Sequence, residues 1–443
     1  MGAKGTQTRR ALMDATRALL ETTALRDLRV AHIVRAARTS SSTFYIYFND
    51  VTDVVLALVG EVTQSPPALL SLVSNRAGQS PAQWARTFVC DYIEHWKLHE
   101  PIFRARNLTS DEGDERFQSV RANAILPLLE GMRRRVETRQ AASKLPADLD
   151  PRSVAIAVLA LLERISVLTD PQLGGRITRA QLIDVAVLFV GLAMGEQPGF
   201  PEGVVASAPP KAVRARIVLA SPSPAGSCAP KFNQRGQILG RKGDRTQDRI
   251  MDATARLLES TSLREISIVD ITRASAIRAS TFYLYFRDVA EIVLAILSRS
   301  PQGNRDLVGL IESEAFETDA RRMSERFVAD YFADWRKNAC IFRARNLASD
   351  EGDARFIEAR RTSVEPLLDA MEARVARRQA SGGFSDALNP HATACALMIM
   401  IERLAATQDV PGYLDRSVAD TSRAAAYFLA VATGTASASQ ART

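Results

Sequence analysis

The feature that most constrains the fold is an internal duplication. At a shift of 238 residues, segment 10–48 matches segment 248–286 with 19 identities in 39 positions. At a shift of 239 residues, IFRARNLTSDEGDERF (102–117) matches IFRARNLASDEGDARF (341–356) at 14 of 16 positions. Each copy spans about 190 to 200 residues, which is too long for a solenoid repeat and typical of a pair of domains. We therefore expect one structural unit that is present twice.

Helical periodicity runs through both copies. In the first copy, apolar residues recur three and four positions apart within 81–99, 114–142, 151–169 and 178–195, and the second copy repeats this order to about Gly434. Neither copy shows the alternating pattern of strands bounded by turn residues. The sequence therefore predicts an all-α protein.

The composition changes between the copies. Residues 197–243 are rich in Pro, Gly, Ser and Ala, and such a segment cannot bury enough apolar surface to offset the entropy of ordering it. We predict a flexible linker there. It separates two copies that each have a smaller N-terminal and a larger C-terminal domain, with boundaries at 1–62, 63–196, 244–300 and 301–436.

Charge and composition narrow the classes of function. No stretch reaches the ~18 uncharged apolar residues of a membrane span, and the N-terminus has no apolar signal segment. We therefore expect a cytoplasmic protein with no membrane partner. The net charge of +7 mildly favours a polyanionic partner.

The sequence contains no catalytic or metal-binding pattern. The four cysteines lie far apart, and the one close histidine pair, His95 and His99, has no HExxH pattern. The chain also has no nucleophile elbow, phosphate-binding glycine loop or dinucleotide fingerprint. We expect no catalytic residue, no metal and no cofactor. The alternative is a helical enzyme that uses Asp111 and Glu112 or their counterparts in the second copy.

Each copy opens with three helical segments. The buried side of the first opening helix is expected to consist of Ala11, Ala15, Ala18, Leu19 and Leu20, with Leu12 at its margin. Two short helices follow at about 30–37 and 40–47, and Ile33, Phe44 and Phe48 can pack them on the opening helix. Outward hydroxyls come from Ser41, Ser42, Thr43, Tyr45 and Tyr47. Such side chains can reach base edges and phosphates, as a DNA recognition helix requires.

Segments 33–48 and 271–286 resemble the DNA-binding segment of the tetracycline repressor (TetR) family, which reads approximately IAxxAGVSxGTFYxHF. The resemblance implies a helix-turn-helix domain in each copy. The implied base-facing residues are Ser41, Ser42, Tyr45 and Ile46 in the first copy and Ala279, Ser280, Tyr283 and Leu284 in the second. The implied phosphate-facing residues are Thr43, Tyr47, Thr281 and Tyr285. The alternative is that the STFY motif is only an aromatic core stripe.

Both copies depart from the family pattern. The turn glycine is Arg38 in the first copy and Ala276 in the second, so a left-handed backbone there would cost each on the order of 1 kcal/mol. The phosphate-binding lysine after the recognition helix is replaced by Val51 and Val289. Basic residues near the domain starts either compensate or form a solvated helix face: Arg9, Arg10, Lys242 and Arg245.

The two recognition segments differ at their starts. Thr39, Ser40 and Ser41 are replaced in the second copy by Ile277, Arg278 and Ala279. A guanidinium such as that of Arg278 can pair bidentately with guanine or hold a phosphate. We therefore expect the copies to read different half-sites, so that the operator is an imperfect palindrome.

The TetR resemblance also implies an inducer pocket and a four-helix pairing interface. Segments 154–168 and 182–194 would form one half of this interface, and segments 394–406 and 424–431 the other. Since both halves belong to one chain, we expect the copies to pair as a pseudo-dimer. A homodimer that pairs between two chains is the alternative.

The repeated FRARNL motif indicates where an effector could bind. An acidic small molecule could pair with its arginines, and the candidate ligand-binding residues are Phe103, Arg104, Arg106, Phe342, Arg343 and Arg345. The favoured alternative is that these arginines pair with the carboxylates of the adjacent SDEGD sequence. There, Asp111 or Asp114 is expected to cap the next helix, and Gly113 to supply the turn.

Taken together, these features predict a sequence-specific DNA-binding transcriptional regulator. We expect a repressor that releases its double-stranded DNA operator when a small-molecule effector binds. A second alternative, beside the enzyme, is a pairing scaffold in which one or both helix-turn-helix units no longer bind DNA.

Overall fold

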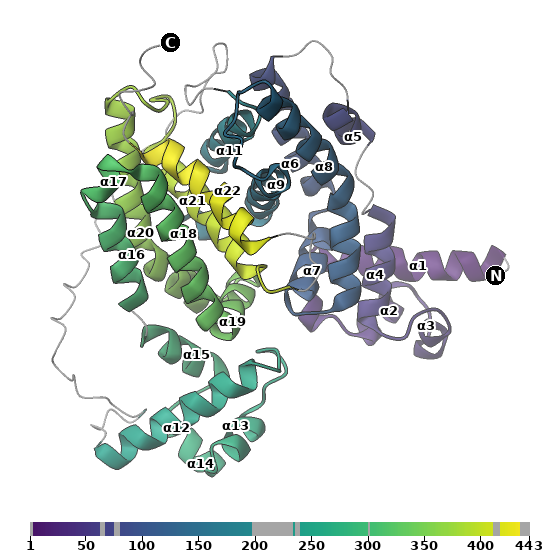
Figure 1. Ribbon diagram of the computed structural model, residues 1–443. Coiled ribbons are helices and arrows are strands. Elements are labelled where there is room, and N and C mark those ends of the chain that lie inside the picture. The colour runs from purple at the N-terminus through teal and green to yellow at the C-terminus, as the bar shows by residue number, and fades with distance from the viewer. Residues whose placement is uncertain are drawn as a thin grey trace.

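This computed structural model describes residues 3–62, 67–74, 80–196, 234, 240–299, 302–410 and 417–434. All regular secondary structure in these segments is helical, which confirms the expected all-α class (Figure 1). No helix within them is both long and apolar enough to cross a membrane. The predicted linker, residues 197–243, lies outside the described residues except for Gln234 and residues 240–243.

Each copy consists of a smaller unit, which we call the head, and a larger helical core. The first head contains α1 (Ala3–Leu20), α2 (Val30–Ala36), α3 (Ser41–Tyr47) and α4 (Val51–Val62), with a 3₁₀ turn at Leu25–Asp27. The first core contains α5 (Pro67–Ser74), α6 (Pro81–Leu98), α7 (Glu100–Asp111), α8 (Glu115–Ala141), α9 (Pro151–Val167), α10 (Asp170–Leu173) and α11 (Arg179–Ala193).

The second copy repeats this order. Its head contains α12 (Arg241–Leu258), α13 (Ile268–Ala274), α14 (Ala279–Phe282) and α15 (Val289–Ser298). Its core contains α16 (Gln302–Glu312), α17 (Ala315–Thr318), α18 (Ala320–Lys337), α19 (Ala339–Asp350), α20 (Ala354–Ala380), α21 (Pro390–Ala406) and α22 (Val418–Thr433). Figure 1 shows the first head at the lower right, beside its own core, and the second head at the bottom, below the second core.

Local capping signals explain where the core helices begin. The side chains of Ser80, Asp150 and Thr178 accept hydrogen bonds from the first turns of α6, α9 and α11. The four long helices expected in the first core are confirmed, with ends that differ from the expected ones by at most two residues. The helix α7, which contains the FRARNL motif, was not among them.

The first head packs around large side chains of α1. Leu12, Met13 and Thr16 are buried, and Ile33, Phe44 and Phe48 are buried with them, as expected for the short helices. The expected buried side of α1 was wrong, because Ala11 and Ala18 are exposed and Ala15, Leu19 and Leu20 are half-buried. The physical reason is area: burying leucine and methionine removes more apolar surface from water than burying alanine.

The two cores pack on each other through their last long helices. α9 and α11 of the first core contact α21 and α22 of the second (Figure 1), and the rings of Phe189 and Phe428 lie 5.4 Å apart. α9 is buried on nearly all sides from Ser153 to Ser166. A helix with apolar residues on nearly all of its sides must be buried on all of them. The first core covers part of α9, and the second core covers the side of α9 that the first core leaves open.

The two heads attach differently to the rest of the molecule. The apolar core of the first head is continuous with that of both helical cores. In the second copy, the head forms a separate apolar cluster that includes Ile341, Ala344, Ala348 and Phe356 of the helical core, with the half-buried Cys340 packed against it. The second head therefore depends more on polar contacts for its position.

Both turns that lack the family glycine adopt a left-handed backbone. The φ angle is 52° at Arg38 and 50° at Ala276. The following amides bond back into the preceding helix, from Thr39 to the carbonyl of Val34 at 2.9 Å and from Ile277 to that of Thr272 at 3.0 Å. These hydrogen bonds require the left-handed residue, so both side chains impose a backbone cost that glycine would avoid.

We predict that Arg38→Gly and Ala276→Gly each raise the free energy of unfolding by about 0.5–1 kcal/mol, because glycine adopts this backbone without strain. Urea unfolding followed by circular dichroism measures the change. Ala37→Gly is the matched control: Ala37 has a φ of −78°, so glycine there should be destabilising. Equal effects at positions 37 and 38 would contradict the prediction.

Candidate DNA-binding heads and the charged cluster between the copies

The recognition helix α3 is capped by a serine. Ser40 Oγ accepts a hydrogen bond from the backbone N–H of Thr43 at 3.1 Å. The same oxygen lies 2.8 Å from Ser42 Oγ and 2.9 Å from Thr43 Oγ1. The capping role of Ser40 was not predicted, although a serine before a helical segment is a recognisable cap signal. The hydroxyls of Ser42 and Thr43 thus have a partner in the protein before any DNA is bound.

The outer face of α3 is open. Tyr45 is 60% and Ile46 72% exposed, although Phe44 between Thr43 and Tyr45 is fully buried. Ser41 and Ser42 are exposed as well, whereas Thr43 and Tyr47 are half-buried. The four residues expected to face bases therefore form the most accessible side of the helix.

The corresponding helix of the second head is shorter. α14 ends at Phe282, and its N-cap residue, Arg278, makes no side-chain capping bond. The replacement of a capping serine by arginine removes an interaction worth about 1 kcal/mol. Both helices nevertheless begin at equivalent residues, Ser41 and Ala279, and α14 is shorter at its C-terminal end. The exposed residues of this segment are Arg278, Ala279, Ser280 and Tyr283, and the half-buried ones are Thr281, Leu284 and Tyr285.

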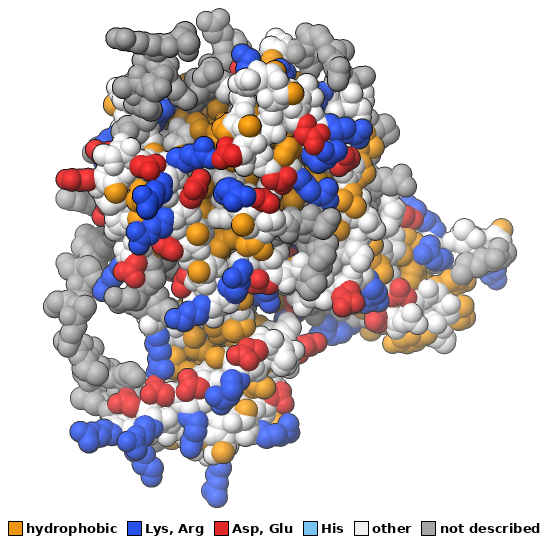
Figure 2. Space-filling model, in the orientation of Figure 1, with side chains coloured by type: hydrophobic (Ala, Val, Ile, Leu, Met, Phe, Trp, Pro, Cys, Tyr) orange, Lys and Arg blue, Asp and Glu red, His pale blue; other side chains and the backbone are white. Residues whose placement is uncertain are grey.

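Basic side chains gather along one edge of the second head. Figure 2 shows Lys and Arg along the lower edge of the molecule, where this head lies, and the exposed ones include Arg241, Lys242, Arg245, Arg249, Arg273 and Arg278. In the first head, Arg10 is paired with Glu61 at 2.9 Å, and the guanidinium of Arg9 lies 5.2 Å from the ring centre of Phe48. Lys242 and Arg245 are therefore more accessible to an anionic partner than Arg9 and Arg10.

The FRARNL arginines pair with other carboxylates than expected. Arg104 bonds Glu100 at 2.6 Å, Arg106 lies 3.6 Å from Glu163, and Arg345 bonds Glu402 at 2.6 Å. The expectation that these three pair with the SDEGD carboxylates was therefore wrong. Two of the partners stand on α9 and α21, which contact the motif only in the folded protein.

The rest of the motif and the SDEGD segment have structural positions. Phe103 is buried 4.9 Å from Trp96, measured between ring centres, and Phe342 is half-buried 5.1 Å from Trp335. Arg343 is exposed. Asp114 caps α8 by accepting from the amides of Arg116 and Phe117, and Gly113 has a φ of 103°, as expected.

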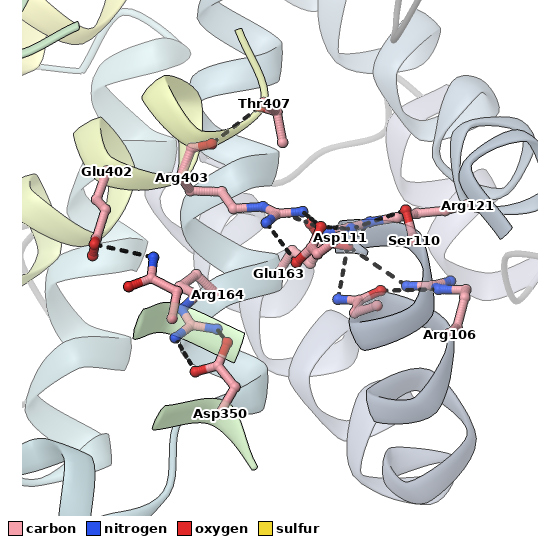
Figure 3. Close-up of polar contacts among 12 residues, drawn as sticks. Arg106, Ser110, Asp111, Arg121, Glu163, Arg164, Asp350, Glu402, Arg403 and Thr407 are labelled. Carbon is pink, nitrogen blue, oxygen red and sulfur yellow. Dashed lines mark hydrogen bonds and ion pairs between the residues drawn. The ribbon is translucent and has the colours of Figure 1, made fainter. Parts of the chain in front are cut away.

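Asp111 does not cap a helix but joins the two copies. Its carboxylate accepts from Arg121 of its own core at 2.8 Å and from Arg403 of the other core at 2.9 and 3.1 Å. The counterpart of Asp111 in the second copy is Asp350, which accepts from Arg164 at 2.6 Å. Figure 3 shows both arginines crossing to the opposite copy. The two contacts are thus related by the pseudo-two-fold symmetry of the duplication.

A buried glutamate, Glu163 or Glu402, lies next to each of these contacts. Burial alone would raise the pKa of Glu163, but the guanidiniums of Arg121, Arg403 and Arg106 outweigh it and lower the pKa to about 2. Arg360, Arg345 and Arg164 do the same for Glu402, whose pKa is also about 2 despite its burial. Both glutamates therefore remain charged in the interior because arginines of both copies surround them.

The sequence contains a signal for these buried charges between the copies. Glu163-Arg164 and Glu402-Arg403 interrupt long apolar runs at equivalent positions of the two copies. Charged residues on a helix that is otherwise buried require partners. The sequence does not indicate which side chains these partners are.

One group of side chains has the spacing of metal ligands. Asp369, Glu372 and His391 offer three ligand atoms within 4.8 Å of one another. Arg176 of the first copy, however, lies 3.0 Å from Asp369 and 2.9 Å from Glu372. A cation there would have to displace this guanidinium, so the group acts as an ion-pair site between the copies.

Comparisons with known proteins match both copies. The family described as "Tetracyclin repressor-like, C-terminal domain" matches residues 69–196 and again residues 307–436, which together are more than half of the chain. The HTH-type transcriptional regulator EthR from two strains of Mycobacterium tuberculosis is 27% identical over 171 residues. EthR of Mycobacterium bovis matches equally. Each alignment covers 38% of this chain and 78% of the relative.

We predict that Glu163→Gln lowers the free energy of unfolding by about 3 kcal/mol, because arginines buried around it lose their compensating charge. The control is Arg321→Gln, which removes another contact between the copies, to Asp148, where both side chains are 54% exposed. Its effect should stay below about 1 kcal/mol. Denaturant unfolding measures both variants, and similar values for the two would show that the buried cluster does not stabilise the pairing.

Proposed function

The chain belongs to the tetracycline repressor-like (TetR) family of transcriptional regulators, and we propose that it binds double-stranded operator DNA through α3 and α14. The observation that carries this proposal is the exposure of Tyr45 and Tyr283, at 60% and 54%, beside the fully buried Phe44 and Phe282. An aromatic core stripe would bury the tyrosines too. The alternation instead anchors each helix and leaves one face free to contact DNA.

We assign the base contacts to the recognition segments of both heads, whose assigned residues are exposed except for the half-buried Leu284. In the first head these residues are Ser41, Ser42, Tyr45 and Ile46, and in the second they are Arg278, Ala279, Ser280, Tyr283 and Leu284. The phosphate contacts are assigned to Thr43, Tyr47, Thr281 and Tyr285. Phosphate contacts set the orientation of a protein on DNA, while base contacts set the sequence that it prefers.

The two heads are proposed to act together as the halves of a pseudo-dimer. The crossed contacts from Arg403 to Asp111 and from Arg164 to Asp350 support pairing within one chain. A two-fold arrangement of heads fits an operator with two half-sites. Because the recognition segments differ, the half-sites are proposed to differ as well. The protein would then act in the cytoplasm as a repressor that a small-molecule effector releases from DNA.

We predict that the full-length protein binds a selected duplex more tightly than a scrambled one, and that affinity for both falls with salt as counterions are released. Titrations at several salt concentrations measure this. Tyr45→Ala and Tyr283→Ala should weaken specific binding. Leu98→Ala, at a position 74% exposed on the first core, should leave it unchanged. Equal, weak binding to both duplexes would support the scaffold or enzyme alternatives instead.

We predict that Arg278→Ala relaxes the sequence preference at one half-site only, by about 1–3 kcal/mol if its guanidinium reads guanine. Tyr47→Phe and Tyr285→Phe should weaken binding with little change in preference, because phosphate contacts are independent of sequence. Selection from random duplexes with each variant measures both effects. Two identical half-sites for the unmodified protein would rule out an unequal role of the heads.

A further inference from the structure

A cavity of about 340 Å³ lies where the second head meets both cores. One wall is residues 258–263, at the end of α12 and in the loop that follows it. The other walls come from residues 110–113 of the first core and from α19 and α21 of the second. Sites for small molecules measure about 300–1,000 Å³, so this cavity is large enough for a small ligand.

Arg343 lines this cavity and, unlike its counterpart in the first copy, forms no ion pair with a described residue. The equivalent residue of the first copy, Arg104, bonds Glu100 at 2.6 Å. In the second copy, the position of Glu100 is occupied by Ala339. Within the described segments, no carboxylate pairs with Arg343. The copies have thus diverged so that the cation remains and its anion is absent.

Trp335 provides a second donor without a partner. It lines the same cavity and is 1% exposed, and its indole Nε1 has no acceptor among the residues that the structure describes. Trp84, by contrast, donates to the carbonyl of Leu72 at 2.9 Å. A buried N–H without an acceptor is unfavourable, and a ligand oxygen in the cavity would satisfy it.

Most other charges around the cavity are neutralised by the protein. The carboxylates bonded to arginines are Asp111, Glu112, Asp350, Glu402 and Asp409. Glu259 is different, since it is exposed and pairs with no cation in the described parts of the chain. Glu259, Cys340 and Arg343 all line the same cavity. A negative ligand at Arg343 would therefore be repelled by Glu259.

We propose that this cavity binds a small monocarboxylate with an apolar body. The carboxylate pairs with the planar guanidinium of Arg343, which matches its geometry. A ligand oxygen accepts the Trp335 N–H. The apolar body lies against Leu258, Leu263 and Ile399, which also line the cavity.

Occupancy of this site would act on the second head alone. The loop of that head is held to residue Glu112 of the first core by Ser262 at 2.9 Å and Arg264 at 2.8 Å. A ligand beneath residues 258–263 changes the surroundings of these bonds, while the first head has no part in the cavity lining. This consequence, unlike the binding itself, rests on the proposed function, because it matters only if the head binds DNA.

The test is a titration of the full-length protein with benzoate and with hexanoate, observed through its indole N–H signals in ¹H–¹⁵N NMR. The chain has three tryptophans, and Trp335→Phe assigns the signal of interest. We expect the Trp335 signal to shift on binding. Benzamide and hexanamide keep the shape and the oxygen of the two acids but lack the negative charge. Their affinity should therefore be at least about tenfold lower than that of the acids.

Matched variants separate this site from general anion binding. Arg343→Gln should weaken benzoate binding about tenfold or more, whereas Arg104→Gln in the first copy should leave it within about twofold. Glu259→Gln should strengthen it, because a repelling charge is removed. No shift of the Trp335 signal up to about 10 mM benzoate, which is weaker than typical specific binding, would overturn the proposal. Equal affinities for benzoate and benzamide would also overturn it. The same would follow if Arg104→Gln weakened benzoate binding as much as Arg343→Gln does.

The titration contains no DNA, so it is independent of the proposed function. Binding of benzoate at Trp335 by a protein that does not bind DNA specifically would support the ligand site and contradict only the regulator proposal. Specific DNA binding without any response of Trp335 to carboxylates would support the regulator proposal and contradict only the ligand site. Hydrogen exchange of residues 258–263, compared with 20–25 of the first head, should show ligand protection only in the second head. Equal protection of both would overturn the proposed one-sided effect.

Discussion

In this structure, an arginine of each core crosses to a carboxylate of the other core. Arg164 and Arg403 stand on helices that are otherwise apolar and buried, so neither charge can be left there without a partner. Each finds its carboxylate on the opposite copy, Asp350 for Arg164 and Asp111 for Arg403. Separating the cores would expose the apolar faces of α9 and α21 and break these two ion pairs, although Asp111 would keep Arg121 of its own core and Asp350 would keep Arg360. Apolar packing and charge pairing therefore favour the same arrangement.

The segment after α7 connects this interface to a head. Asp111 contacts the second core, and the next residue, Glu112, accepts hydrogen bonds from Ser262 and Arg264 of the second head. One short stretch of the first copy thus bonds both parts of the second. Because the second head has its own separate apolar cluster, these polar contacts contribute more to its position than equivalent contacts would in the first head.

Duplication within one chain also allowed the copies to diverge. In a homodimer, every substitution appears in both halves, whereas here Ser40 is matched by Arg278 and Glu100 by Ala339. The first change removes a helix cap and places a cation at the start of a recognition helix. The second leaves an arginine without its anion beside a cavity. Both differences lie in regions where an unequal response to DNA or ligand would arise.

The sequence by itself determined the helical class, the duplication and the outward face of the recognition helices, because periodicity, caps and turn residues act over a few positions. It also located the left-handed turns at Arg38 and Ala276. Only the tertiary structure decided which side of α1 is buried and which carboxylates the arginines meet. Those outcomes depend on which helices come together, and the crossed pairs join residues 186 and 292 positions apart. No local pattern encodes contacts over such separations.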